Sequence, residues 1–158
     1  MTDPGRIAQS AGGAKRRPTM KLSRTIAYAI QATLQLSAGE RGVPIPCSRL
    51  ADAGRMPERF LLQILRSLVT RGLLRSTRGV DGGYYLARSP EQISLCDIVE
   101  AFDNPLNPNL PVLESLSPDV RKRIVAVLNG ASHAAHQELS KLTMADLMRV
   151  NRHDGGEN

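Results

Sequence analysis

The sequence contains few residues of the kinds that carry redox, metal or stacking chemistry. Its 158 residues include two cysteines and no tryptophan, and only 3% of them are aromatic. Cys47 and Cys96 are too few for a disulfide framework, and their spacing does not match a metal-binding motif. This cysteine usage predicts a protein of the reducing cytoplasm. With so few aromatic side chains, the core must be built from leucine, isoleucine, valine and alanine.

Long apolar runs are also lacking. No stretch approaches the roughly 20 apolar residues of a membrane-spanning helix. Residues 1–19 lack the apolar segment of a secretory signal. No nucleophile, base and orienting group form a recognisable catalytic set. These absences predict a chain that has no membrane partner, needs no cofactor and is not an enzyme.

Positive charge is present and lies mainly in the first part of the chain. The formal net charge is +6. Residues 1–90 contain 15 Lys and Arg against 5 Asp and Glu, whereas residues 91–158 contain 6 against 10. This distribution favours a polyanionic partner, with nucleic acid ahead of an anionic membrane surface.

Three helices are predicted in the basic part, over residues 20–38, over 46–53 and from Pro57 to just before Gly72. Pro46 begins the second helix and Gly54 follows its end. The first helix has an apolar face of Leu22, Ile26, Ile30 and Leu34. The third has a buried stripe of Phe60, Leu61, Ile64, Leu65 and Leu68. This order is typical of a helix-turn-helix, although a helical hairpin with solvated arginines fits the same pattern.

A β-hairpin follows the third helix. Residues 73–77 and 84–88 are β-prone, and the sequence RGVDGG joins them. Asp81 and Gly82 form a turn dipeptide, and the adjacent glycines permit positive φ. A phosphate-binding loop is excluded because its glycines must open a helix, whereas a strand follows here. A hairpin in this position predicts the wing of a winged helix.

The remaining residues predict capped helices and one long helix. Ser94 with Asp97, and Thr143 with Asp146, form acidic capping boxes. A segment with three prolines, residues 103–111, precedes a helix from Pro118 to about residue 139. Its apolar stripe requires a partner, and we favour a second copy of the chain over folding back. The stripe consists of Val120, Ile124, Val127, Ala131, Ala135 and Leu139.

The predicted fold class is mainly α with a small β-hairpin wing, a winged helix-turn-helix plus a long C-terminal dimerisation helix. Met20 is a candidate natural start, because ordered periodicity begins there. The expected division is a disordered basic tail over 1–19, the winged helix-turn-helix over 20–92, linker and dimerisation helices over 93–150, and a disordered tail over 151–158.

The motifs together resemble the Rrf2 family of bacterial transcriptional regulators. The resemblance covers about residues 20–150 and rests on MKLSR, FLLQILRSLVTRGLLRSTRGVDGGYYLAR, ISLCDIVEAF and LTMADL. The stretch around the hairpin is the most specific part. The resemblance implies a homodimer in which the long helix crosses to the other subunit.

The resemblance also implies which residues contact double-stranded DNA. The major-groove candidates are Arg59, Phe60 and Gln63, although the periodicity places Phe60 in the core. The minor-groove candidates on the wing are Arg78, Gly79, Gly82 and Gly83. The phosphate-contact candidates are Lys21, Arg24 and Arg75.

The main departure from the family concerns sensing. Cluster-binding members carry three cysteines after the fifth helix, whereas residues 103–119 contain none. We therefore expect no iron–sulfur cluster. His133 and His136 are three residues apart, but no carboxylate or cysteine is clearly beside them, so no metal site is predicted. Cys47 is a candidate redox thiol because a helix N-terminus lowers a thiol pKa. Cys96 is expected to be buried and inert.

The predicted function is a sequence-specific DNA-binding repressor that acts as a cytoplasmic homodimer. The alternative is a winged-helix interaction module whose basic face binds an acidic protein. The signal that controls the regulator stays open at this point. Oxidation of a thiol, an unidentified ligand at the dimer interface or a partner protein could each control it.

Overall fold

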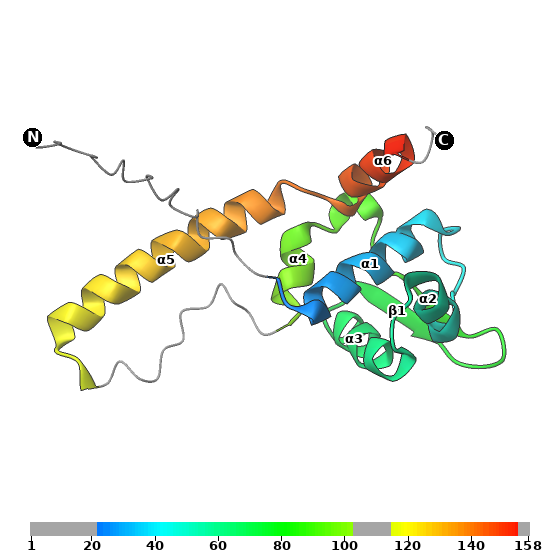
Figure 1. Ribbon diagram of the computed structural model, residues 1–158, viewed down its shortest axis with the longest axis horizontal. Helices are drawn as coiled ribbons and strands as arrows, with labels where there is room; N and C mark the ends of the chain where they lie inside the picture. The colour runs from blue at the N-terminus through cyan, green and yellow to red at the C-terminus, as the bar shows by residue number, and fades with distance from the viewer. Residues whose placement is uncertain (1–21, 103–114, 155–158) are drawn as a thin grey trace, which may run out of the picture.

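The computed structural model describes residues 22–102 and 115–154, with side chains described as far as Asn151. The expected N-terminal tail, the candidate start Met20, the phosphate-contact candidate Lys21 and the segment 103–111 lie outside these residues. Of the expected C-terminal tail, residues 155–158 lie outside, whereas residues 151–154 belong to a helix rather than to a disordered tail. Figure 1 shows the elements, which are α1 Arg24–Ala38, α2 Cys47–Gly54, α3 Glu58–Thr70, β1 Leu74–Thr77, β2 Gly83–Leu86, the short 3₁₀ helix η1 Pro90–Gln92, α4 Leu95–Glu100, α5 Pro118–Ser140 and α6 Met144–Asp154.

The predicted fold class is confirmed. The described part is mainly helical, with a two-stranded antiparallel hairpin directly after α3. The hairpin register pairs Leu74 with Leu86 and Thr77 with Gly83. In Figure 1, α1, α2, α3 and the hairpin gather at one end, α4 lies beside α1, and α5 extends away from them. No described helix is both long enough and apolar enough to cross a bilayer.

The buried face of α1 differs from the expected one. Leu22 is 41% exposed, and of the expected apolar face only Ile26 is fully buried. The buried side centres on Ala29, Ala32 and Leu36, together with Thr33 and Ser37. The two hydroxyls donate to backbone carbonyls one turn earlier in the helix, at 2.7 Å each. Small and internally hydrogen-bonded side chains therefore allow α1 to pack closely against its neighbours, which leucine periodicity does not reveal.

The core of the winged-helix part is built largely from leucine, as the composition required. On α3 the predicted stripe is buried at Leu61, Ile64, Leu65 and Leu68. The helix ends as expected, because Gly72 has φ +70° and the Leu73 amide donates to the Leu68 carbonyl at 3.0 Å. The side chains that are almost fully buried elsewhere in this core are Leu50, Leu74, Ile93, Ile98 and Met144.

Two capping boxes join the C-terminal helices to this core. Ser94 and Asp97 cap α4, and the same exchange between Thr143 and Asp146 starts α6, as the sequence predicted. The two cap residues also form an isolated antiparallel bridge, Ser94 to Thr143. This bridge anchors the start of α6 beside the start of α4. The helix α4 itself is short and ends at Glu100.

Within the described residues, the long helix α5 packs against the rest of the chain near its C-terminal end. Ala135 and Leu139 pack against a small buried cluster of Ile26, Cys96 and Val99. No residue of α5 is buried in the described chain. Figure 1 shows the N-terminal part of α5 pointing away from the other helices. The apolar stripe of this part is therefore left without a partner within the described residues.

Candidate nucleic-acid interface

The helix-turn-helix consists of α2, a three-residue turn and α3. Its turn differs from the expected one, because Gly54 is the last helical residue and Arg55 takes the left-handed conformation at φ 50°. Met56 is buried, and its amide donates to the Ala51 carbonyl at 2.8 Å. A Cβ on Gly54 would lie 2.4 Å from Met56 Cε, which is the end of a flexible side chain that can move aside.

The outer face of α3 carries three long polar side chains. Arg59, Gln63 and Arg66 are exposed and follow one another at intervals of four and three residues. They therefore lie along one side of the helix. Sequence analysis did not include Arg66 among the site residues, although this spacing was sufficient to find it.

Phe60 lies on a different side of α3. It is half-buried and packs against the core. Its ring meets that of Tyr28 on α1 edge to face, with centroids 5.9 Å apart and an interplanar angle of 72°. This contact agrees with the periodicity of Phe60 and differs from the groove position that the family resemblance implied.

The wing loop depends on its glycines in a different way from the one expected. Only Gly79 has a positive φ, at 109°. A Cβ on Gly82 would lie 2.6 Å from the Thr77 carbonyl oxygen, and the Gly82 amide donates to the Gly79 carbonyl at 3.1 Å. The expectation of positive φ at the adjacent glycines is wrong, since Gly82 requires close approach within the loop instead.

The need for glycine at position 83 comes from the segment around Ile45, whose place beside β2 was not predicted from the sequence. Ile45 and Tyr84 exchange two backbone hydrogen bonds of 2.9 Å, so that Ile45 lies along β2 as an isolated bridge. A Cβ on Gly83 would lie 2.5 Å from the Ile45 carbonyl. The prolines on either side of Ile45 were the available signal, because the residue before a proline favours an extended conformation.

Positive charge on the face of α3 and the wing is not neutralised by ion pairs among the residues that the structure describes. Arg59, Arg66, Arg75 and Arg78 are all exposed. Among residues 22–102 and 115–151, the ion pairs of arginine join Arg88 to Asp97 and Arg149 to Asp146. We call the surface formed by Arg59, Gln63, Arg66, Arg75 and Arg78 the α3–wing face. Arg24 is also exposed, at the first residue of α1.

The thiol of Cys47 has a different environment from the one expected. Cys47 begins α2 and is half-buried. Burial is the main cause that raises the pKa of this thiol above its usual value, and nearby Glu58 adds to it. The Sγ atom lies 3.8 Å from the Glu58 carbonyl oxygen. The expectation of a lowered pKa for this thiol is therefore wrong.

The second thiol has several polar neighbours, and Ser140 forms a side-chain hydrogen bond with it. Cys96 is 2% exposed, and burial is the main cause that raises the pKa of its thiol. Its Sγ lies 3.2 Å from Nδ1 of His136, and the same nitrogen lies 3.1 Å from Oε1 of Glu100. Sequence analysis found no cysteine or carboxylate beside the histidines, because α4 and α5 meet only in the folded chain. His133 does not belong to this cluster.

The proposed dimer residues of α5 differ in exposure. Val127 is 72% exposed and Val120 is 46% exposed. Ala131 is also exposed, whereas Ile124 is half-buried. Apolar side chains that are exposed together along one side of a helix, rather than scattered singly, indicate an interaction surface.

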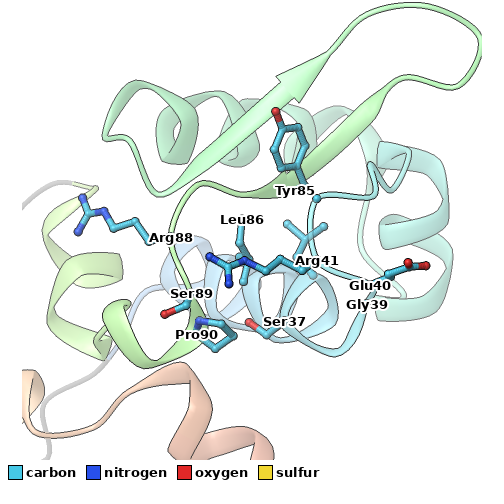
Figure 2. Close-up of a pocket in the computed structure, with 11 residues that line it drawn as sticks. Ser37, Gly39, Glu40, Arg41, Tyr85, Leu86, Arg88, Ser89 and Pro90 are labelled. Atoms are coloured by element: carbon cyan, nitrogen blue, oxygen red, sulfur yellow. The ribbon is translucent and has the colours of Figure 1, made fainter.

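A small pocket lies beside the hairpin, between the end of α1 and β2. Its volume is about 60 Å³, and Ser37, Arg41, Leu86 and Ser89 are among the residues that line it. Figure 2 shows the Arg41 side chain reaching across the pocket, while Glu40 points away. Known ligand pockets are several times larger, so this one does not suit an organic effector.

Comparisons with known proteins agree with this geometry. The Rrf2 family model, described as an iron-dependent transcriptional regulator, matches residues 22–150. An HTH-type transcriptional regulator of Mycobacterium tuberculosis is 40% identical over 87 residues, which cover 55% of this chain and 54% of that protein. This match therefore spans about half the length of that relative. CymR, an HTH-type regulator of Bacillus subtilis, is 28% identical over 81% of this chain and 89% of its own.

Solved structures show the same fold. The structure of B. subtilis CymR, titled the global cysteine regulator, has a TM-score of 0.65 and 26% identity, and the match covers 84% of this chain and 98% of that one. The structure of T. potens IscR has a TM-score of 0.61 and 27% identity, over 88% and 93%. These matches confirm the predicted class, a transcriptional regulator rather than an enzyme.

The family description raises the question of an iron–sulfur cluster. Such clusters are held mainly by cysteine thiolates, usually four. The chain has two cysteines. Of these, only Cys96 lies in a group of metal-ligating side chains within the described residues, and Cys47 is not part of that group. The donor set does not fit an iron–sulfur cluster.

Proposed function

Because this chain belongs to the Rrf2 family of transcriptional regulators, we propose that it is a sequence-specific DNA-binding repressor that binds a pseudo-palindromic operator as a homodimer. The observation that carries the proposal is the α3–wing face. There, exposed arginines with no ion-pair partner in the described part of the chain flank an exposed glutamine on the outer side of α3. We also propose that the protein acts in the cytoplasm, where bacterial operator DNA lies.

In this proposal α3 enters the major groove. The groove is about 12 Å wide and admits one helix with its outer side chains toward the base edges. Gln63 offers both a donor and an acceptor, the pattern that pairs with adenine. Arg59 pairs with the two acceptors of guanine, and Arg66 lies further along the same side of the helix.

The wing adds contacts beside the recognition helix. Arg78 follows β1 and precedes Gly79, so its exposed side chain stands at the base of the wing loop. A guanidinium in this place suits a narrow minor groove, whose negative potential attracts arginine. Arg75 and Arg24 are proposed to contact phosphates, which fixes the position of the protein without selecting a sequence.

The long helix α5 would provide the interface of the proposed homodimer. Val120, Val127 and Ala131 share an exposed apolar side of α5 that a second copy would cover. Two α3 helices related by a two-fold axis would meet successive major grooves, about 34–36 Å apart. A dimer that occupies a promoter in this way blocks RNA polymerase, which is the basis for proposing a repressor.

Arg78→Ala tests the role of the wing. We expect it to weaken binding of duplex DNA and to reduce the dependence of log K on log salt by about 1, since one cation fewer reaches the backbone region. The measurement is fluorescence anisotropy of a labelled operator over a series of salt concentrations. Arg123→Ala is the matched control, because Arg123 is exposed on α5, away from the α3–wing face.

Equal DNA affinity of the Arg78→Ala and Arg123→Ala proteins would argue against the wing contact. The alternative function, a module that binds an acidic protein, predicts DNA binding without any preference for sequence. A basic face that binds a poly-glutamate chain as tightly as a selected duplex would support that alternative.

A further inference from the structure

We propose that Cys96, Glu100 and His136 form a binding site for one divalent transition-metal ion of the zinc class, at the junction of α4 and α5. Each residue offers one ligand atom, and the three atoms lie within 4.8 Å of one another. The site is distinct from the segment in which cluster-binding relatives carry their cysteines. It also goes beyond the DNA-binding function proposed above.

The three donors come from two helices whose contact is fixed by packing. Cys96 and Glu100 are four residues apart on α4, so both lie on the same side of that helix. His136 lies on α5 between Ala135 and Leu139, and these two residues pack against the cluster that contains Cys96. The packing of α5 on α4 therefore brings the imidazole to the thiol and the carboxylate.

The distances suit a tetrahedral zinc ion. Zinc bonds of about 2.3 Å to sulfur and about 2.0–2.1 Å to nitrogen and oxygen place tetrahedral ligand atoms about 3.3–3.6 Å apart. Cys96 Sγ and His136 Nδ1 are 3.2 Å apart, and His136 Nδ1 and Glu100 Oε1 are 3.1 Å apart. Shifts of a few tenths of an ångström would bring both pairs to the expected separation.

A hydrogen-bonded triad explains the arrangement less well. Sγ and Oε1 both approach the same ring nitrogen, Nδ1 of His136. A ring nitrogen carries at most one hydrogen and can donate fully to only one of them. In a cysteine–histidine–carboxylate triad, the thiol and the carboxylate contact opposite nitrogens. Three ligand atoms within 4.8 Å of one another, from a thiol, an imidazole and a carboxylate, are an arrangement that a metal ion can bridge.

The donor set and its exposure also indicate the kind of site. One thiolate, one imidazole and one carboxylate favour zinc over magnesium or calcium, which prefer oxygen ligands alone. Cys96 is buried, whereas the side chains of His136 and Glu100 are 50% and 38% exposed. The site therefore opens to solvent and leaves a fourth position for water or another ligand, as in zinc sites with three protein ligands.

An ion at this place would join α5 directly to the winged-helix part. Ala135 and Leu139 otherwise provide the main contact of α5 with that part. Any effect of the ion on dimer geometry and DNA affinity presupposes the proposed DNA-binding function. Metal binding itself does not presuppose that function, so the metal site and the DNA-binding function can be refuted separately.

Cobalt substitution tests the site in the full-length, untagged and reduced protein after treatment with a chelator. We expect one equivalent of Co²⁺ to bind per chain with a near-ultraviolet thiolate-to-cobalt charge-transfer band, and Zn²⁺ to displace it. His136→Ala and Glu100→Gln should each weaken Co²⁺ binding at least about 10-fold. Cys96→Ser should abolish the charge-transfer band.

Matched controls lie nearby in the chain. His133→Ala removes the other histidine of α5, and Cys47→Ser removes the other thiol; both should keep the band and bind Co²⁺ within twofold of the unmodified protein. Because Cys96 is buried and its replacement can disturb folding, the exposed His136 provides the second variant. No charge-transfer band in the unmodified protein, or equal weakening by His133→Ala and His136→Ala, would overturn the proposal.

Discussion

Gln63 is the residue at which base recognition can be tested most finely. Its side chain is exposed on α3 between two arginines of the α3–wing face. Replacing an amide that pairs with one base removes discrimination at that position while leaving the phosphate contacts in place.

We expect Gln63→Ala to cost about 1–3 kcal/mol of binding free energy on the selected operator and to relax the preference at a single base position. The measurement is competition binding with operators substituted one base pair at a time. Gln137→Ala, at an exposed glutamine of α5, should change neither quantity. A uniform loss across all operators would show that Gln63 contacts the backbone instead.

Gly83 shows a different residue-scale effect, on stability. The missing Cβ allows β2 to approach the Ile45 carbonyl closely. Gly83→Ala is therefore expected to destabilise the fold by about 1–3 kcal/mol, because the added methyl group must push two backbone segments apart. Urea denaturation followed by circular dichroism measures this change.

Gly130→Ala is the matched control for the glycine substitution. Gly130 lies inside α5, and a Cβ there meets no atom within 4 Å. Alanine favours a helix interior by about 1 kcal/mol relative to glycine, so this variant should be slightly more stable. Equal destabilisation by the two changes would contradict the explanation of Gly83 by close approach.

At the scale of elements, α5 carries the proposal of a homodimer. Its exposed apolar side cannot be satisfied by the part of the chain that the structure describes. Two copies of that side, related by a two-fold axis, would remove the valines from water.

Val127→Asp tests this element. A carboxylate in an apolar interface costs several kcal/mol when it has no partner, and the symmetry of a dimer places it twice in one interface. We expect the variant to sediment as a monomer at concentrations at which the unmodified protein is a dimer. Asn129→Asp, on the opposite side of α5, should leave the dimer intact, and a dimer that survives Val127→Asp would place the interface elsewhere.

Elements that depend on local signals could be predicted from the sequence. The capping boxes at Ser94 and Thr143 form as expected, since each is complete within four residues. Gly72 ends α3 for the same kind of reason. The buried face of α1 was misplaced because alanine and threonine, rather than leucine, fill the closest contacts.

Features that depend on distant contacts could not be predicted. The role of Gly83 depends on Ile45, and the cluster around Cys96 depends on His136 from another helix. The raised pKa of the Cys47 thiol depends on burial and on nearby Glu58, and both come from the folded chain. The sequence shows these residues, but only the packing of elements shows which of them meet.

At the scale of the whole molecule, the parts have separate roles in the proposed function. The basic face of α3 and the wing provides affinity for DNA, α5 provides the two-fold symmetry, and the junction of α4 and α5 lies between them (Figure 1). Because phosphate contacts contribute much of the affinity, binding should weaken steeply as salt concentration rises.

Selection of duplexes from a random pool by the unmodified protein tests the central claim most directly. The account predicts an enriched motif with two inverted half-sites, whose centres are about 10–10.5 base pairs apart. Each half-site should contain the position at which Gln63→Ala relaxes the preference. Recovery of duplexes without any enriched sequence would contradict the account.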